Sequence, residues 1–276
     1  GMKQWEQPWR TDVPAEKRTI KGAAGNPDVD IYIINADPAN PRPAILHTHG
    51  GGYIGGSAKM FVSNLQTICD ELGCMAVSVE YRLAPETTYA GSIEDNYAGL
   101  KWLYDNAEAI GADKTRIAVM GESAGGGHAA LLAITARNRG EVPVAFQCLT
   151  YPMLDDRTGS TQIPAPHIGK IMWNADENVF GWRSFLGMKP GGEGVPAAAV
   201  PSRNLDLTGL PPAWIGVGGI DLFVDEDVDY AQRLNAAGVF AELIVVPGAF
   251  HAFDGVAAET TIAQWFNRAR MTALRR

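Results

Sequence analysis

The sequence predicts an α/β fold, in which a mainly parallel sheet of about eight strands is covered by helices on both faces. Three observations support this prediction. Short apolar segments alternate with longer segments of helical periodicity along most of the 276 residues. A Gly-x-Ser-x-Gly pattern joins one apolar segment to helical sequence. An acidic residue and a histidine follow two late apolar segments, where the sites of parallel sheets lie.

The expected elements follow one another along the chain in a regular order. The expected strands are 18–21, 29–35, 44–48, 75–79, 116–120, 145–149, 214–217 and 242–246. The helical segments among them are 57–72, 92–106 and 124–139. Because a Gly-Asn-Pro-Asp turn separates the first two strands, we expect those strands to pair as a hairpin.

Composition describes one globular domain over residues 1–276. Hydrophobic residues make up 46% of the chain and charged residues 20%, which is enough apolar material to bury both faces of a sheet. The net charge of -8 and the lack of Lys/Arg clusters argue against nucleic acid as a partner. Cys69, Cys74 and Cys148 lack the spacing of a disulfide framework or zinc site and are interpreted as buried thiols.

The sequence also predicts where the protein works. No segment is long and apolar enough to span a bilayer. The first five residues lack the apolar core of a signal peptide. We therefore expect a cytoplasmic protein.

The regular alternation stops between about residues 155 and 210. Prolines and glycines there surround an aromatic helical stretch that contains Trp173, Phe180, Trp182 and Phe185. We interpret 155–210 as a cap inserted into the domain. The aromatic side chains could line an acyl or alcohol pocket, although their near-helical spacing is equally typical of a packed cap interior.

Ser123 is the candidate nucleophile. It lies in Gly121-Glu122-Ser123-Ala124-Gly125, directly after an apolar strand and directly before helical sequence. Small residues two before and two after the serine allow a strand to turn sharply into a helix, which raises the hydroxyl above the sheet edge. An isolated match would fit an ordinary turn or helix N-cap, and the flanking strand and helix favour the catalytic interpretation.

The His-Gly-Gly-Gly motif at 49–52 is the candidate oxyanion loop. Glycines allow unusual backbone angles and close approach of a ligand, so we expect the N–H groups of Gly51 and Gly52 to act together with that of Ala124. A phosphate-binding loop is a poorer interpretation, because no Gly-x-Gly-x-x-Gly spacing or Lys-Ser/Thr pair is present. His49 is expected to fix the loop by hydrogen bonding.

Asp221 and His251 are the candidate partners of the serine. Each follows a late strand, and the order serine, acid, histidine is the one that this strand–turn–helix arrangement requires. Histidine would accept the serine proton while the carboxylate orients the ring. Asp221 has rivals in a following acidic segment that is also typical of a helix N-terminus, namely Asp225, Glu226, Asp227 and Asp229. Asp225 is the strongest of these rivals.

Together these motifs resemble the hormone-sensitive-lipase-like branch of the α/β-hydrolases, a family of bacterial esterases. The matching segments are His49-Gly50-Gly51-Gly52, Tyr81-Arg82-Leu83-Ala84-Pro85-Glu86, Gly121-Glu122-Ser123-Ala124-Gly125-Gly126, Gly209-Leu210-Pro211-Pro212-Ala213, Asp221 with Asp225-Glu226, and His251 followed by Phe253. The resemblance implies a Ser123–Asp221–His251 triad, a small ester substrate of short to medium acyl length, and neither a metal nor an organic cofactor.

The chain departs from the family pattern in three places. Glu122 stands where the family commonly has aspartate, and the late acidic motif reads Asp-Leu-Phe-Val-Asp-Glu rather than Asp-Pro-Leu-Arg-Asp-Glu. Neither change removes a catalytic group. Only 48 residues precede His49, so the N-terminal helices that usually complete the family's cap are expected to be short or absent.

Other functions remain open at this stage. The same triad could serve an amidase, lactonase or deacetylase, since fold and triad do not fix the leaving group. A small-molecule receptor of the same fold is a further alternative, although such a receptor normally lacks a triad member. The helical segment 257–274 could support a homodimer, although packing on its own sheet explains the same pattern.

Overall fold

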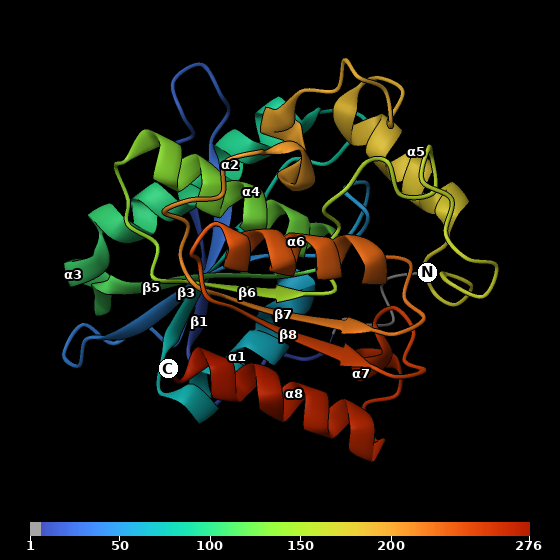
Figure 1. Ribbon diagram of the computed structural model, residues 1–276. Helices are drawn as coiled ribbons and strands as arrows, with labels where there is room; N and C mark the ends of the chain where they lie inside the picture. The colour runs from blue at the N-terminus through green and yellow to red at the C-terminus, as the bar shows by residue number, and fades with distance from the viewer. Residues whose placement is uncertain (1–6) are drawn as a thin grey trace.

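The computed structural model describes residues 7–276, so the expectation for the first five residues lies outside the described part. Its centre is one eight-stranded sheet with the order β1-β2-β4-β3-β5-β6-β7-β8 (Figure 1). The strands are β1 (Ala15–Ile20), β2 (Val29–Ile34), β3 (Arg42–Thr48), β4 (Met75–Glu80), β5 (Ala112–Glu122), β6 (Phe146–Thr150), β7 (Ala213–Gly218) and β8 (Ala241–Val246). The predicted fold class is confirmed.

Strand direction separates a short antiparallel edge from the rest of the sheet. β1 pairs antiparallel with β2, as expected for a hairpin, and β2 pairs antiparallel with β4. All later neighbours, from β4 and β3 through β8, are parallel. Parallel strands end at the same edge, so the residues that follow β3, β5, β7 and β8 are brought to one side of the molecule.

Helices cover both faces of this sheet. They are α1 (Val62–Leu72), α2 (Tyr89–Asp105), α3 (Ala107–Ile110), α4 (Ala124–Arg139), α5 (Ala175–Leu186), α6 (Val224–Ala236), α7 (Phe253–Val256) and α8 (Thr261–Leu274), with short 3-10 turns η2 (Ala58–Phe61), η3 (Ala197–Ala199) and η4 (Pro201–Arg203). Figure 1 shows α2, α4 and α6 on one face and α1 and α8 on the other. Alternate strand residues therefore enter two separate cores, with Leu46 in one and Ile45 in the other.

Two predicted boundaries were wrong in an informative way. Trp173 precedes α5 instead of lying within it, because Asn174 caps the helix: its side chain accepts from the Glu177 N–H at 3.1 Å, and the Glu177 carboxylate accepts from the Asn174 N–H at 3.0 Å. The terminal helix begins at Thr261 and not at 257, because the Thr260 hydroxyl caps it.

The segment between β6 and β7 contains α5 and packs on the loop that follows β3. Its buried Trp182 and Phe185 contact the ring of Tyr53, with centroids 5.2 and 3.9 Å away. Phe180 of the same helix is exposed. Trp182 and Phe185 thus belong to the packed interior of this segment, whereas Phe180 lies on its surface. No helix among residues 7–276 has the length and apolar composition needed to cross a membrane.

Candidate active site

Ser123 lies at the sharp turn between β5 and α4. Its backbone has φ 58° and ψ -124°, a conformation that non-glycine residues rarely adopt. Neighbouring backbone groups hold this conformation: the Ser123 N–H donates to the Thr150 oxygen, and the Met153 N–H donates to the Ser123 oxygen, both at 2.9 Å. The turn leaves the side chain half-buried at the edge where the parallel strands end.

The glycines around Ser123 are required by close backbone contacts. A Cβ on Gly121 would lie 2.3 Å from the Gly125 oxygen, and one on Gly125 would lie 2.1 Å from the Thr48 oxygen. A Cβ on Gly127 would lie 2.2 Å from the Met153 oxygen. Because no side chain fits at these distances, the strand–turn–helix can close only with glycine there.

The structure brings Ser123, His251 and Asp221 into direct contact. His251 Nε2 lies 2.9 Å from Ser123 Oγ, and His251 Nδ1 lies 2.8 Å from Asp221 Oδ2. The second carboxylate oxygen of Asp221 accepts from the Phe223 N–H at 3.0 Å. An ionised carboxylate only accepts, so Nδ1 carries the proton and Nε2 is free to accept the serine proton.

Burial and aromatic packing fix the histidine in this position. Asp221 is fully buried and His251 is nearly so. The edges of the imidazole meet Tyr151 and Phe223, with ring centroids 4.8 and 5.2 Å away and interplanar angles of 66° and 86°. Sequence reasoning missed both aromatic residues, although Phe223 is only two positions after Asp221 and Tyr151 directly follows β6.

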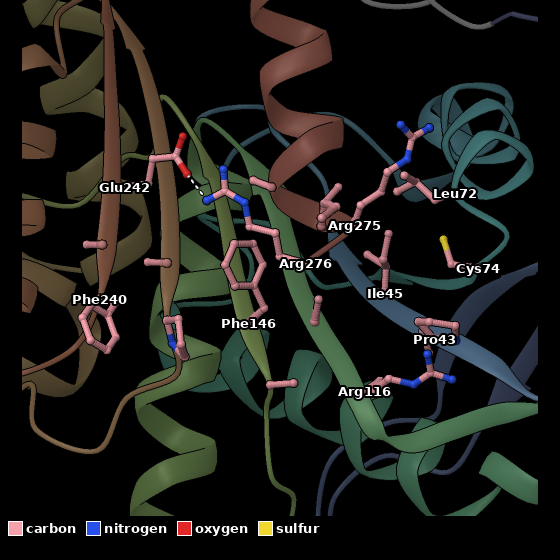
Figure 2. A pocket seen from close by; sticks show the side chains of 18 of the residues that line it. Pro43, Ile45, Leu72, Cys74, Arg116, Phe146, Phe240, Glu242, Arg275 and Arg276 are labelled. Carbon is pink, nitrogen blue, oxygen red and sulfur yellow. Dashed lines mark hydrogen bonds and ion pairs between the residues drawn. The ribbon is translucent and has the colours of Figure 1, made fainter.

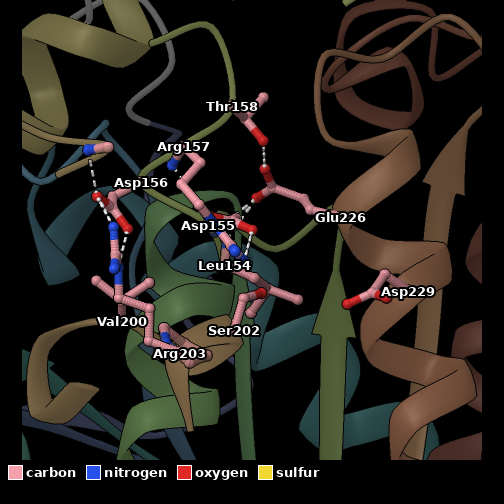
Figure 3. Close-up of polar contacts among 12 residues, drawn as sticks. Leu154, Asp155, Asp156, Arg157, Thr158, Val200, Ser202, Arg203, Glu226 and Asp229 are labelled. Atoms are coloured by element: carbon pink, nitrogen blue, oxygen red, sulfur yellow. Dashed lines mark hydrogen bonds and ion pairs between the residues drawn. The ribbon is translucent and has the colours of Figure 1, made fainter. Parts of the chain in front are cut away.

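The rivals of Asp221 lie elsewhere. Asp225 and Asp229 are exposed on α6. Glu226 is buried and accepts from the Leu154 and Asp155 N–H groups at 2.6 and 3.1 Å and from the Thr158 hydroxyl, as Figure 3 shows. Asp227 is buried and its carboxylate has no hydrogen-bond partner within residues 7–276. Burial, followed by neighbouring carboxylates, raises the pKa values of Glu226 and Asp227 well above their ordinary range.

The 49–52 loop lies against the serine. A Cβ on Gly50 would be 3.6 Å from Ser123 Cβ. Gly51 and Gly52 have φ values of 132° and 62°, and neither of their N–H groups donates to a backbone oxygen in the described chain. Ala124 is the first residue of α4, where a helix N–H has no partner within the helix. These three N–H groups are therefore free to bind an anionic oxygen.

His49 supports this loop. Its Nδ1 donates to the Gly50 oxygen at 2.9 Å, and its ring stacks on Tyr81 with centroids 4.1 Å apart. Burial lowers the pKa of His49 to about 4, so the ring is neutral at physiological pH. The Tyr81 hydroxyl in turn donates to the His49 oxygen at 2.6 Å.

Trp173 covers the same loop from the segment between β6 and β7. Atoms of its indole would lie 2.3 to 3.1 Å from a Cβ on Gly52. The indole N–H donates to Asn178 Oδ1 at 3.1 Å, and the buried Asn178 amide donates to the Thr158 oxygen at 2.9 Å. The indole is thus held in place against Gly52 of the loop.

Two further features of the described chain lie outside the contacts of Ser123. Within residues 7–276 no group of three or more His, Cys, Asp or Glu side chains is arranged to hold a metal ion. A cavity of about 920 Å³ lies at the opposite edge of the sheet, where β3 and β8 begin; Pro43, Phe146 and Phe240 line it, and Arg276 pairs there with Glu242 (Figure 2). That cavity does not include Ser123.

Known proteins are similar to this chain in sequence and in structure. A family model described as the α/β-hydrolase fold matches residues 45–255. Esterase LipI of Mycobacterium tuberculosis is 32% identical over 98% of this chain and 84% of its own length, and carboxylesterase NlhH of the same species is 33% identical over 95% and 82%. A solved structure, the bacterial heroin esterase, superposes with a TM-score of 0.90 at 38% identity, covering 96% of this chain and 84% of that chain.

Proposed function

Because this chain belongs to the hormone-sensitive-lipase-like esterases of the α/β-hydrolase fold, we propose that Ser123, His251 and Asp221 hydrolyse small carboxylic esters. The observation that carries the proposal is the unbroken contact from Asp221 Oδ2 through the imidazole to Ser123 Oγ, at 2.8 and 2.9 Å. The names of the relatives, esterase and carboxylesterase, favour ester hydrolysis over the amidase, lactonase, deacetylase and receptor alternatives.

The first half of the reaction forms an acyl-enzyme. Ser123 Oγ attacks the ester carbonyl carbon while its proton moves to His251 Nε2. The carbonyl oxygen becomes an oxyanion, which the N–H groups of Gly51, Gly52 and Ala124 stabilise. When the tetrahedral intermediate collapses, the bond to the alcohol oxygen breaks and the imidazolium returns its proton to that oxygen.

The second half repeats this chemistry with water. His251 removes a proton from a water molecule, and the water oxygen attacks the acyl carbon. The carbonyl oxygen again becomes an oxyanion, which the same three N–H groups stabilise. Collapse of that intermediate breaks the bond to Ser123 Oγ, which takes the proton back from the imidazolium. The carboxylic acid leaves and the resting enzyme is restored.

Residues 155–210 form the cap of this site in our proposal. Two contacts with the 49–52 loop support it: the indole of Trp173 packs on Gly52, and a Cβ on Gly181 of α5 would lie 2.7 Å from the Gly52 oxygen. A bulky indole fixed this close to the proposed oxyanion donors reduces the room for a long acyl chain. We therefore propose acyl groups of short to medium length.

We also propose that the protein is cytoplasmic and that it forms a homodimer. Cys69, Cys74 and Cys148 are buried free thiols, as a protein of the reducing cytoplasm would have. The edge strand β8 and the terminal helix α8 expose Val245 and Trp265, and a second copy of the chain would cover them. Light scattering of the purified protein tests the homodimer, and fractionation of the native cells tests the location.

Hydrolysis of a p-nitrophenyl ester series from acetate to dodecanoate tests the proposed function. The wild type, Ser123→Ala and the control Ser63→Ala, which removes a hydroxyl on α1, are compared. We expect turnover that peaks at the shorter esters, survives in Ser63→Ala and disappears in Ser123→Ala. Turnover that persists in folded Ser123→Ala would show that another residue is the nucleophile, and no turnover by any folded variant would favour the amide, lactone or receptor alternatives.

A further inference from the structure

A cluster of buried polar side chains lies beneath the Ser123 turn, on the face of the sheet covered by α8. It links the residue before the nucleophile to the loop that carries the histidine. Each side chain belongs to a residue that is less than a tenth exposed, and none of them is required by the reaction steps above. The members are His47, Glu122, Tyr151, Asp254 and Arg270.

Glu122 and Arg270 form the first part of the cluster. Glu122 Oε2 lies 3.0 Å from His47 Nε2, and the other nitrogen of that ring lies 2.8 Å from the Ser78 hydroxyl. The second oxygen of Glu122 faces Arg270 Nη1 at 3.8 Å. Burial opposes ionisation of Glu122, but His47 and Arg270 more than offset it, so the pKa of this carboxyl lies below its ordinary value.

Asp254 and Tyr151 connect the cluster to the histidine. Arg270 Nη1 also faces Asp254 Oδ2, at 3.9 Å. The Tyr151 hydroxyl donates to the other oxygen of Asp254 at 2.8 Å, and the Tyr151 ring meets the His251 ring with centroids 4.8 Å apart. The phenol is therefore held at one end by a carboxylate while its ring supports the imidazole.

Arg270 is held loosely within this cluster. One guanidinium lies between two carboxylates at distances longer than a hydrogen bond, and its Nε has no partner within the described chain. Tyr151 links the Asp254 carboxylate to the His251 ring, so the negative charge of Asp254 favours the imidazolium that forms during proton transfer. Other groups around the His251 ring are Asp221 in direct contact and, beyond it, the buried carboxyls Asp227 and Glu226 of α6.

We propose that Glu122, Arg270 and Asp254 form a positioning cluster that, through Tyr151, holds the His251 ring against Ser123 and sets the charge around it. Asp254 and Arg270 then act on the histidine in opposite directions. The carboxylate favours the protonated ring, and the guanidinium disfavours it. This inference rests on the proposed function, because it assigns the cluster a role in the work of His251.

The test measures how the rate of Ser123 labelling by a fluorophosphonate depends on pH, a readout that needs the nucleophile and base but no particular ester. Asp254→Asn keeps the shape of the acceptor for Tyr151 but removes its charge. We expect the acidic limb of the profile to move to lower pH by about half a unit and the plateau rate to fall about threefold. Glu259→Gln, which removes an exposed charge before α8, should leave the profile unchanged.

Variants of Arg270 test the opposite effect on the acidic limb of the profile. Arg270→Gln should move the acidic limb to higher pH by about half a unit, whereas Arg270→Lys keeps the charge and should restore the limb. If Arg270→Gln does not fold, because two carboxylates are left without the buried guanidinium, the decision rests on Asp254→Asn. The double variant Asp254→Asn/Arg270→Gln should return the limb close to that of the wild type.

Opposite shifts in the two charge-removing variants support the inference, because a merely structural role would lower the rate at every pH without moving the limb. A limb in folded Asp254→Asn that coincides with that of the wild type would overturn it. Failure of the wild type to be labelled at Ser123 would instead overturn the proposed function, so the two failures are distinguishable.

Discussion

Replacement of Asp221 by asparagine is expected to disable the histidine while leaving the site's shape intact. The Asp221 carboxylate accepts from two donors, His251 Nδ1 at 2.8 Å and the Phe223 N–H at 3.0 Å. An asparagine has one oxygen and one NH₂ group, so one of these donors must face another donor. If the NH₂ faces the ring, the ring takes the tautomer with its proton on Nε2 and no longer accepts the proton of Ser123.

The size of the effect follows from losing the general base. Asparagine in this role in a serine–histidine–aspartate site lowers the turnover number by about 10⁴, which corresponds to about 5.4 kcal/mol of transition-state stabilisation. A buried hydrogen bond to a charged group contributes about 1.5–3 kcal/mol to folding, so the melting temperature should also fall by several degrees.

The assay is kcat and KM for p-nitrophenyl butyrate in wild type, Asp221→Asn and the matched control Asp225→Asn. Asp225 carries the same side chain but is exposed on α6, so its replacement should change kcat less than about twofold. We expect KM to be nearly unchanged in Asp221→Asn, since the carboxylate orients the base and does not contact the ester. Equal losses in the two variants, or a larger loss in Asp225→Asn, would refute this reasoning.

Three further variants test other parts of the structure. In Gly52→Ala the new methyl would lie 2.3 Å from the Trp173 ring at a φ of 62°, so we expect at least a tenfold fall in kcat/KM in ester assays. Tyr81→Phe leaves the buried His49 oxygen without its donor and should lower the free energy of unfolding by about 1–3 kcal/mol in urea titrations. Asp227 has a raised pKa in the folded state, so the folded protein holds its proton longer than the unfolded chain and loses stability as pH rises from about 4 through that raised value. Asp227→Asn should therefore be relatively more stable at pH 8 than at pH 4, and an unchanged difference in melting temperature between the two pH values would contradict this.

The sheet was predictable because its signals are local. Apolar runs ending in glycine or a polar residue gave eight strands close to their observed positions, and the helix 124–139 was predicted at its observed bounds. The predicted starts of two helices, α5 and α8, were wrong because an N-cap side chain determines where each helix begins. The aromatic stretch predicted a helix that includes Trp173, whereas the Asn174 cap makes α5 begin at Ala175.

The candidate triad was predictable from chain order and strand ends. In a parallel sheet, residues that follow different strands meet at one edge, which is why Ser123, Asp221 and His251 come together across 30 and 128 positions of sequence. The support around the triad was not predictable in this way. Tyr151 and Asp254 are 103 positions apart, and neither lies in a motif, so only the packing of α7 and α8 on the sheet brings them together.

The burial of Arg270 in the positioning cluster was likewise not predictable from the sequence. A charged residue in an amphipathic terminal helix is expected to face solvent, yet Arg270 is buried against Glu122 and Asp254. The sequence showed the helix but not the carboxylates from β5 and α7 that make burial of the guanidinium tolerable.

Mass spectrometry of the fluorophosphonate-treated protein tests the central claim most directly. The claim is that Ser123 is a nucleophile activated by His251. It predicts a single phosphonyl adduct, located on the peptide that contains Ser123, absent in Ser123→Ala and formed at least a hundredfold more slowly in His251→Ala. An adduct on another residue, or labelling of Ser123 at an unchanged rate in folded His251→Ala, would contradict it.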